Sequence, residues 1–342
     1  MCKFSYTKYI FNMKKIFKIL AYAIGVFLVF VICGIAFVNF TYPKVSPALE
    51  LTIDHGPDRV ARGAYLANHV VVCVDCHSTR DFSLLSGPIK PGTIGEGGEL
   101  FDHSMGFPGV FYSKNITPTG ISDYSDGELF RLITTGVTND GRAMFPIMPY
   151  PYYGKMDPED IYDIIAYIRT LDPIESEIPD SKADFPVSLI LKTIPKDADP
   201  QTKPAKTDQI AYGGYLVNAA SCGECHSPVD AQGTRLPGKD YSGGREFSFP
   251  DGSVVRSANL TPDASTGIGS WSEDTFVGKF KQYLDSGYHL PKVQPGEFNT
   301  IMPWVMYAGM EESDLKAIYA YIKTLTPIPN QVVKFSPPVT SE

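Results

Sequence analysis

Basic residues are scarce outside the N-terminus of this 342-residue chain. Residues 1–44 hold six of its 30 lysines and arginines and none of its 38 acidic residues, which leaves 24 basic and 38 acidic residues in the rest. A body with a net charge of −14 repels the phosphate backbone, so we expect no nucleic-acid partner. Small molecules, or proteins with a basic face, are the partners that this charge favours.

The sequence also lacks any sustained alternation of apolar and polar residues, which argues against a fold built on long strands. It does not lack apolar material, because 43% of the residues are hydrophobic, and this excludes disorder throughout. The 30 glycines and 28 prolines make up about 17% of the chain, against a usual ~12%. We therefore expect a mainly α fold with long loops.

A long uncharged stretch lies near the N-terminus. Residues 19–38 carry no charge and are long enough, at ~1.5 Å per residue, to cross ~30 Å of hydrocarbon. Five lysines precede the stretch and Lys44 follows it, so the positive-inside rule places the N-terminus in the cytoplasm and the body outside. A cleaved signal peptide is the rival interpretation, and a lipoprotein site at Cys33 fits poorly because Ile32 precedes it. Met13 is an alternative start, because residues 1–12 add nothing that the anchor needs.

The body repeats itself once. The segment MFPIMPYPYYGKMDPEDIYDIIAYIRTLDPI matches FNTIMPWVMYAGMEESDLKAIYAYIKTLTPI, with Met148 on Met302 and Met156 on Met310 at a constant offset of 154. Upstream, GAYLANHVVVCVDCHS matches GGYLVNAASCGECHS. Two homologous units, which we call the first unit (58–173) and the second unit (209–327), therefore follow the anchor. Two copies at this spacing indicate a duplicated domain rather than a solenoid.

These patterns predict five segments along the chain. They are the cytoplasmic tail and transmembrane anchor (1–44), a first domain (45–173), a linker (174–208), a second domain (209–330) and a C-terminal tail (331–342). The linker contains five prolines and one apolar run, VSLILKTI, which we expect to pack against a domain. Each unit should contain a helix before the cysteine pair (59–69 and 210–220), a short central helix (125–135 and 272–283) and a final helix.

The final helix of the first unit is the clearest of these. Asp157 is a good N-cap and Pro158 suits the first helical position. Isoleucines at 161, 164, 165 and 168 and the leucine at 171 then form one apolar face. Apolar residues at 315, 318, 319, 322 and 325 repeat that face in the second unit.

Four of the six cysteines lie in CVDCH (73–77) and CGECH (222–226). Such pairs can form disulfides, redox centres or zinc sites, but a zinc ribbon places its second pair some 15–20 residues on and a thioredoxin-type site needs a βαβ context. The histidine that follows each pair decides between these alternatives, because CxxCH is the attachment signature for c-type haem. The sequence thus predicts two covalently bound haem c groups, held by Cys73, Cys76 and His77 and by Cys222, Cys225 and His226.

Each iron needs a sixth ligand. The methionines of the two Met-Pro pairs are matched between the units and lie on loops where the proline can hold a thioether rigidly. Core packing is the alternative role for them, because methionine is an adaptable filler. We predict that Met148 and Met302 are the distal ligands, and that Met156 and Met310 fill the core. The other histidines are unmatched and are expected at the surface or in loops: His55, His69, His103 and His289.

Other matched residues are expected to support the structure. Gly63 and Gly213 could allow close helix crossings, with Tyr167 and Tyr321 on the final helices as partners. Two aromatic residues could reach a haem propionate or pack in the core: Tyr124 and Trp271. Three arginines could pair with propionates or lie solvated at the surface: Arg80, Arg142 and Arg235.

The order of motifs resembles a known family. CxxCH, then Asn-Ile/Leu-Thr-Pro, Thr-Gly-Ile, an aromatic residue, Met-Pro and a final helix ending AYI-R/K-TL resembles class I cytochrome c domains. The type is that of the membrane-bound dihaem cytochrome c subunits of periplasmic alcohol and aldehyde dehydrogenases. The resemblance covers 58–330 and implies two tandem class I cytochrome c domains. It also implies haem-linking Cys73, Cys76, Cys222 and Cys225, proximal His77 and His226, and distal Met148 and Met302.

The chain departs from that family in two respects. The dehydrogenase subunits carry three haems where this chain has two motifs, and Tyr124 stands where the pattern expects tryptophan. We expect an electron relay at the periplasmic side of the inner membrane, between a dehydrogenase or quinol-oxidising complex and a terminal oxidase or another cytochrome. The alternative is a haem enzyme, either a dihaem peroxidase or a thiosulfate dehydrogenase-like oxidoreductase, which needs an open or exchangeable sixth position. A haem sensor ranks last, because no signalling segment is visible.

Overall fold

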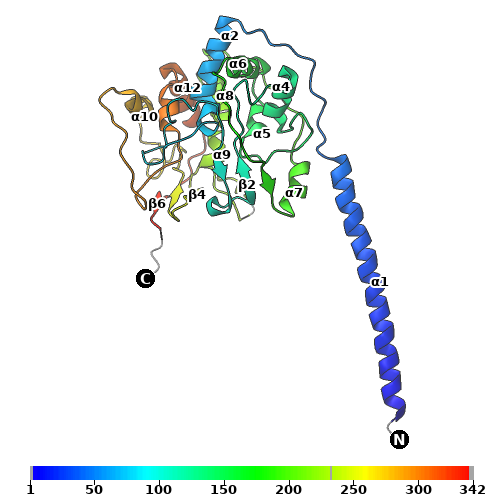
Figure 1. Cartoon of the computed structure of the whole chain (residues 1–342). Coiled ribbons are helices and arrows are strands. Elements are labelled where there is room, and N and C mark those ends of the chain that lie inside the picture. Colours follow the sequence, from blue (N-terminus) through cyan, green and yellow to red (C-terminus); the bar gives the residue numbers. More distant parts are fainter. Residues whose placement is uncertain (1–2, 232, 339–342) are drawn as a thin grey trace.

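The computed structural model describes residues 3–231 and 233–338. Cys2 and the end of the expected C-terminal tail, 339–342, lie outside this range. A compact body of short helices and loops carries one long helix, α1 (Lys3–Thr41), which projects away from it (Figure 1). Within the described residues, Met13–Thr41 is the one helical stretch long and apolar enough to cross a membrane, and its large apolar side chains are exposed.

The helices of the two units follow the same order, and the predicted mainly helical fold is confirmed. In the first unit they are α2 (Pro57–Tyr65), a π-helical turn (Leu66–Val70), α3 (Cys73–Cys76), α4 (Asp126–Thr135), α5 (Tyr150–Tyr153) and α6 (Pro158–Ile168). In the second they are α8 (Gln209–Ala219), α9 (Cys222–His226), α10 (Glu273–Lys281), α11 (Trp304–Ala308) and α12 (Glu312–Ile322). The short helix α7 (Val187–Ile190) lies between the units, and 3-10 turns occupy His103–Met105, Leu191–Thr193 and Gln282–Leu284.

Side-chain caps define where several helices begin. The Asp157 carboxylate accepts a hydrogen bond from the backbone N–H of Glu159, which confirms the predicted N-cap of α6. Ser125 and Glu128 form a capping box at the start of α4, and Ser272 caps α10. The central helices therefore start within a residue of their predicted positions.

Two small antiparallel sheets complete the units. Strands β1 (Leu100–Phe101), β2 (Gly109–Tyr112) and β3 (Lys182–Ala183) form one sheet, and β4 (Glu246–Ser248), β5 (Val254–Arg256) and β6 (Phe335–Ser336) form the other. The third strand comes from the linker in one case and from the C-terminal tail in the other. Each unit is thus closed by the segment that follows it in the chain.

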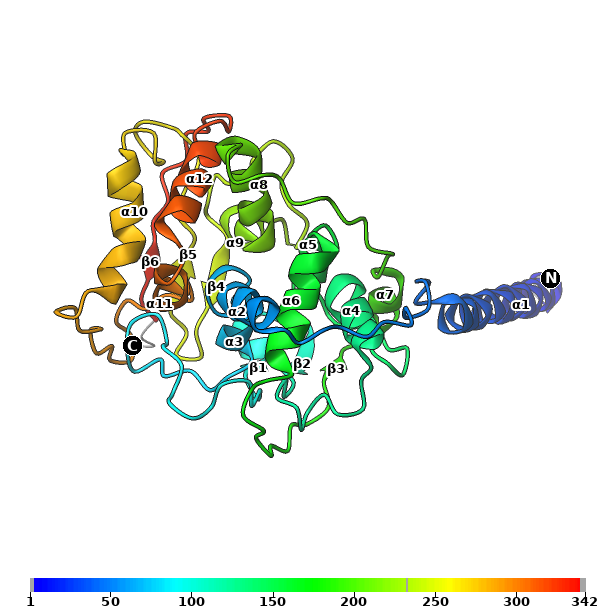
Figure 2. The ribbon, with the colours of Figure 1, turned by 90° about the horizontal axis from the view of Figure 1, so that it is seen from above.

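Within each unit the first and last helices cross very closely, as we expected from the matched glycines Gly63 and Gly213. A Cβ at Gly63 would lie 1.8 Å from the backbone oxygen of Asp163, and one at Gly213 would lie 1.9 Å from that of Ala317. Only glycine leaves room for α2 against α6 and for α8 against α12, and Figure 2 shows both pairs side by side. The nearest side-chain atoms, at 2.9 and 3.0 Å, are the Cβ atoms of the two expected partners, Tyr167 and Tyr321.

The π-helical turn absorbs one extra residue in the first unit. Cys73 follows Gly63 by ten positions, whereas Cys222 follows Gly213 by nine. A π turn adds one residue to a helix without changing its direction, so the cysteine pair keeps its place. His69 lies in this turn and its Nδ1 donates to the backbone oxygen of Met306 at 2.9 Å. The expectation of a surface position is therefore wrong for His69, which lies half-buried between the units.

The two units exchange hydrogen bonds reciprocally. Tyr65 of the first unit donates to Oδ2 of Asp314 in the second at 2.8 Å, and Tyr215 of the second donates to Oδ2 of Asp160 in the first at 2.7 Å. Both carboxylates are fully buried. The tyrosines occupy matched positions in the repeat, as do the aspartates. The units therefore pack with approximate two-fold symmetry.

The linker lies along the first unit. The backbone N–H groups of Asp199 and Gln201 donate to the carbonyls of Gly154 and Lys155, which ties the linker to the end of α5. The apolar run packs only in part, because Leu191 is buried while Ile190 is exposed. Its end contacts α1, where Lys192 donates to Asn39 at 2.6 Å.

Candidate functional site

Both cysteine pairs lie in short helices entered through a strained residue. Val72 and Ser221, the residues before α3 and α9, have left-handed backbone with φ of 53° and 46°. Neither is glycine, so the surrounding packing must hold both turns in place. The thiols of Cys73, Cys76, Cys222 and Cys225 are all free, so the structure does not show the disulfide alternative.

The protonation of these thiols argues against a redox centre. Burial raises the pKa of the Cys73 and Cys222 thiols to about 12 and that of Cys225 to about 11. Burial also raises the pKa of Cys76. Reactive cysteines have lowered pKa values because the thiolate is the nucleophile, so these four are poor redox groups on their own. No cluster of three or more metal-binding side chains occurs among the described residues either, which leaves the zinc alternative without a ligand set.

The histidine after each pair is fixed in one tautomer. Nδ1 of His77 lies 2.6 Å from the carbonyl oxygen of Lys114, and Nδ1 of His226 lies 2.7 Å from that of Ala258. Because a carbonyl can only accept, each Nδ1 carries the proton and each Nε2 carries the lone pair. Burial lowers the pKa of both rings, which favours this neutral form. An imidazole oriented through Nδ1 with Nε2 free to coordinate is the arrangement that metal-bound histidines adopt.

The two Met-Pro pairs form the same tight turn. Tyr150 N–H donates to the carbonyl of Met148 at 2.7 Å, and Trp304 N–H donates to that of Met302 at 2.8 Å. Pro149 and Pro303 lie at the centres of these turns, with ψ of 53° and 64°, which is the inverse γ-turn. Both methionines are partly buried and pack against the core. By contrast, the expected core residues are confirmed as fully buried: Met156 and Met310.

A loop of the first unit holds the turn that presents Met302. The buried Ser86 hydroxyl donates to the Met302 carbonyl at 2.6 Å and accepts from Trp304 N–H at 3.1 Å. Asn299 Oδ1 accepts from Ser86 N–H, and its amide donates to the Phe82 carbonyl at 3.0 Å. The second unit's Met-Pro turn is therefore braced by the first unit.

Charged side chains surround each attachment helix. In the first unit Arg80 pairs with Asp75, the third residue of the CxxCH motif, at 2.9 Å and also pairs with Glu99. Arg80 is almost completely buried, so the solvated alternative does not apply to it. In the second unit Glu224 pairs with Arg245 at 2.5 Å and with Arg235 at 3.1 Å.

The second motif contacts the first unit, because the Tyr152 hydroxyl donates to Glu224 Oε2 at 3.2 Å. Tyr153 and Tyr307, which are matched in the repeat, are both buried. Burial, with contributions from the thiols at 73, 76 and 225, raises the pKa of Tyr153 well above its ordinary value. Burial also raises that of Tyr307, with contributions from the thiols at 222 and 225. Cysteines of both motifs therefore lie close to one tyrosine.

Several other predicted residues lie apart from these motifs. Arg142 is exposed and pairs with Asp140, and His103 is exposed and pairs with Asp184. His55 and His289 are exposed, as expected. The hydroxyl of Tyr319 donates to the Trp271 carbonyl, and the Trp271 side chain packs against the core. Tyr124 also packs against the core.

Three residues that the sequence did not single out belong to the site: Ser86, Glu99 and Arg245. They lie in loops where the two units differ in sequence and length. The repeat offset changes from 149 at the cysteines to 144 at the Asn-x-Thr-Pro motif. A closer alignment of these loops would have matched Glu99 with Arg245, but only the fold shows that Arg245 pairs with Glu224 of α9 and that Glu99 pairs with Arg80, the partner of Asp75 in α3.

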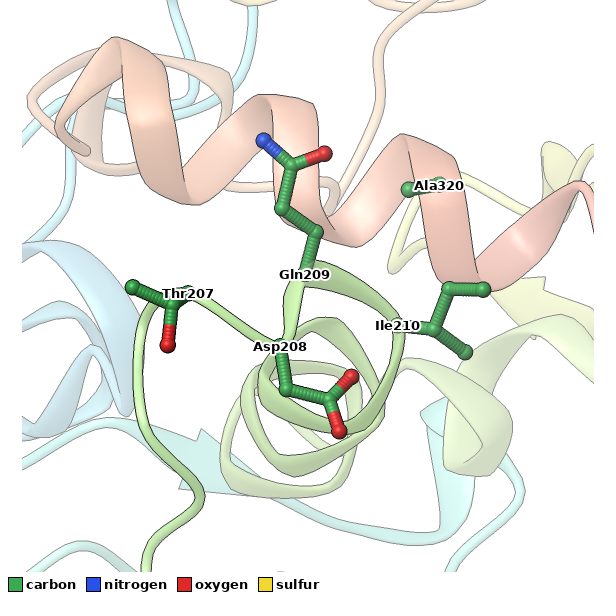
Figure 3. Close-up of a pocket in the computed structure, with 5 residues that line it drawn as sticks. All are labelled: Thr207, Asp208, Gln209, Ile210 and Ala320. Carbon is green, nitrogen blue, oxygen red and sulfur yellow. The ribbon is translucent and has the colours of Figure 1, made fainter.

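A surface hollow at the start of α8 is not part of this arrangement. Thr207, Asp208, Gln209, Ile210 and Ala320 line it (Figure 3). The cysteine pair follows the opposite end of α8, so the hollow and the motif lie at different ends of one helix.

Comparison with known proteins agrees with this geometry. Residues 210–326 match the cytochrome c family, a range that runs from the start of α8 past the end of α12. The chain contains a cytochrome c domain. Such a domain implies covalently bound haem c, and the free thiols and oriented histidine of α9 fit that group. This cytochrome c domain thus accounts for the second CxxCH motif.

The chain is also similar to cytochrome proteins over most of its length. It is 30% identical over 302 residues to the cytochrome c subunit of a quinone alcohol dehydrogenase of Gluconacetobacter polyoxogenes, covering 82% of this chain and 59% of that one. It is 28% identical over 283 residues to a gluconate 2-dehydrogenase cytochrome c subunit of Pantoea cypripedii, covering 78% and 59%. A dihaem c-type cytochrome of Cereibacter sphaeroides is 26% identical over 265 residues, covering 75% and 82%. The chain therefore spans 59% of the length of each of these two dehydrogenase subunits.

Proposed function

We propose that the chain is a dihaem cytochrome made of two tandem cytochrome c domains. The observation that carries this proposal is the repetition of one geometry: in both units the histidine after a free cysteine pair donates its Nδ1 proton to a backbone carbonyl. A match over 302 residues is longer than the second unit and must include much of the first, which supports a second domain of the same kind. Each haem is linked by Cys73 and Cys76 or by Cys222 and Cys225.

The residues around each haem suit electron transfer rather than catalysis at iron. His77 and His226 are the proximal ligands through Nε2, and Met148 and Met302 are the distal ligands, held by their γ-turns. A bound haem c supplies a one-electron centre, and a thioether opposite an imidazole favours ferrous iron and raises the potential. With both axial positions filled, little rearrangement accompanies the transfer of an electron.

We also propose where the protein works. Helix α1 anchors the body at the periplasmic side of the inner membrane, supported by its length, its apolar surface and the lysines that precede it. The redox partners are a dehydrogenase or quinol-oxidising complex on one side and an oxidase or another cytochrome on the other. The relatives, which are cytochrome subunits of dehydrogenases, support the first of these.

The test is to change the ligands one at a time in the membrane-extracted full chain. Pyridine haemochrome assay should give two covalent haems per chain. Met148→Ala and Met302→Ala should each remove part of the weak near-infrared sulfur-to-iron band, lower one potential and create one high-spin haem. Met156→Ala and Met310→Ala are the matched controls, because they remove a buried methionine eight residues further on and should leave both spectrum and potentials in place.

Two results would overturn the proposal. One covalent haem or none would exclude the dihaem assignment. Wild-type protein that binds carbon monoxide fully and turns over peroxide quickly would show an open iron, and the haem-enzyme alternative would take its place.

A further inference from the structure

Positions 99 and 245 are structurally equivalent and carry opposite charges. Glu99 N–H donates to Ser113 Oγ and its carbonyl accepts from Ser113 N–H, at 2.9 and 3.0 Å. Arg245 makes the same pair of bonds with Ser257, both at 3.1 Å. The two residues therefore lie at one place in the fold, just before the short sheet of each unit. The first unit has an acidic residue at the position where the second unit has a basic one.

The first unit's charges form a buried cluster with a surplus of acid. Arg80 lies between Asp75 and Glu99, and the side chains of these three residues are 7%, 6% and 12% exposed. One guanidinium cannot neutralise two carboxylates, so the cluster has a net charge of −1 when both are ionised. Burial raises the pKa of Asp75 to about 6 and also raises that of Glu99, so the full charge develops only above these raised pKa values. Because water is largely excluded, this charge is weakly screened.

The second unit's cluster has a surplus of base. Glu224 pairs with both Arg245 and Arg235, whose side chains are 24% and 34% exposed. Asp240 lies 3.9 Å from Arg235, but it is 59% exposed and well screened by water. The part of the cluster that touches the attachment helix therefore has a net charge of +1.

Both clusters lie directly beside the haem-linking cysteines. Asp75 and Glu224 are the third residues of the two CxxCH motifs, one position before Cys76 and Cys225. Burial is the largest cause of the raised pKa of the Cys76 thiol. The charges of Arg80, Asp75 and Glu99 are close enough to contribute to this pKa as well. Those of Arg245 and Glu224 reach the Cys225 thiol in the same way.

The sign of such a cluster changes the potential of a haem linked there. A ferric haem carries one more positive charge than a ferrous haem, so a nearby negative charge stabilises the oxidised form and lowers the potential. A nearby positive charge has the opposite effect. We propose that the opposite charges at Glu99 and Arg245 give the first unit's haem the lower potential, so that electrons enter at the first unit and leave from the second. The inference rests on the proposed function, in which each unit holds one haem.

The test is a spectroelectrochemical titration of the full chain, resolved into two one-electron steps. Glu99→Gln should raise only the lower potential. One charge at ~12 Å in an effective dielectric of ~20 changes the ratio of reduced to oxidised haem about tenfold, or about 59 mV. Arg245→Gln should lower only the upper potential, and by less, because Arg245 is more exposed. The steps are assigned with Met148→Ala and Met302→Ala, which mark the first and second haem.

Matched controls separate charge from general disturbance. Glu246→Gln and Arg256→Gln remove a neighbouring ion pair that contacts neither attachment helix, and they should leave both steps in place. Glu99→Asp and Arg245→Lys keep the charge and should return each potential most of the way to that of the wild type.

The outcomes distinguish this inference from the proposed function. Two haems with both potentials unchanged in Glu99→Gln and Arg245→Gln overturn the inference alone. A lower step that belongs to the second unit also overturns it. A chain with fewer than two covalent haems overturns the proposed function and the inference with it. If Glu99→Gln does not fold, Arg245→Gln still decides the matter.

Discussion

Two glycines determine how closely the first and last helices of each unit approach. At Gly63 and Gly213 the opposing backbone oxygen occupies the space in which a Cβ would lie. This contact fixes the position of the first helix along the last one. It thereby also positions the cysteine pair, which follows the first helix in the chain. A single methyl group at either position must therefore move a whole helix.

We expect Gly63→Ala and Gly213→Ala each to lower the free energy of unfolding by about 1–3 kcal/mol, through overpacking. Gly278→Ala is the control, because Gly278 lies inside α10 with nothing within 4 Å of its Cβ position. That substitution should stabilise the protein by about 0.4–1 kcal/mol, since alanine loses less entropy in a helix. Urea unfolding followed by circular dichroism measures all three. Equal effects at Gly63 and Gly278 would contradict the close crossing.

At the residue scale, the sequence predicted the role of the two glycines in close helix crossings but not the role of Ser86. Gly63 and Gly213 are matched in the repeat, and a glycine that recurs inside a helical pattern, where it costs stability, indicates close packing. The repeat matches no serine of the second unit to Ser86, and nothing local distinguishes it from other loop serines. Its role depends on Met302, which lies 216 positions away. Contacts over such separations need the fold.

The elements of the two units were predictable wherever their local signals are strong. Asp157 and Pro158 located the start of α6, and Ser125 that of α4. The π turn was not predicted, because one extra residue before Cys73 is visible only when the two units are compared. The six short strands were missed too, since two to four residues are too few for an alternating pattern.

The loop that carries Ser86 belongs to the first unit but bonds to the Met302 turn of the second, so loss of the Ser86 hydroxyl should destabilise that turn. Ser86→Ala leaves the Met302 carbonyl and Trp304 N–H without their shared hydroxyl partner, so we expect a loss of about 1–2 kcal/mol in the free energy of unfolding. Ser83→Ala is the control, because Ser83 is exposed and its hydroxyl bonds to Asp81, two residues away in the same loop. Guanidinium titration gives both values. A Ser86→Ala protein as stable as Ser83→Ala would show that the loop merely touches the turn.

At the scale of the whole molecule the duplication was predictable and the packing of its halves was not. The repeat with offset 154 shows that Asp160 and Asp314 correspond, but it does not show that each is bound by a tyrosine of the other unit. These reciprocal hydrogen bonds join the two similar units into one body, since each buried carboxylate accepts a hydrogen bond from a tyrosine of the other unit.

The reciprocal bonds should make the two units unfold together. Tyr65→Phe and Tyr215→Phe each remove a hydrogen bond from a fully buried carboxylate, and such bonds contribute about 1.5–3 kcal/mol. Each single variant should therefore lower the midpoint of one shared transition. The double variant should unfold in two steps, because the units then lose their mutual support. Tyr319→Phe is the control, since its hydroxyl binds the neutral Trp271 carbonyl within the second unit and should cost only about 1 kcal/mol with one transition retained. Scanning calorimetry separates the cases, and a double variant that still melts in one step at the wild-type midpoint would mean that the tyrosines do not couple the units.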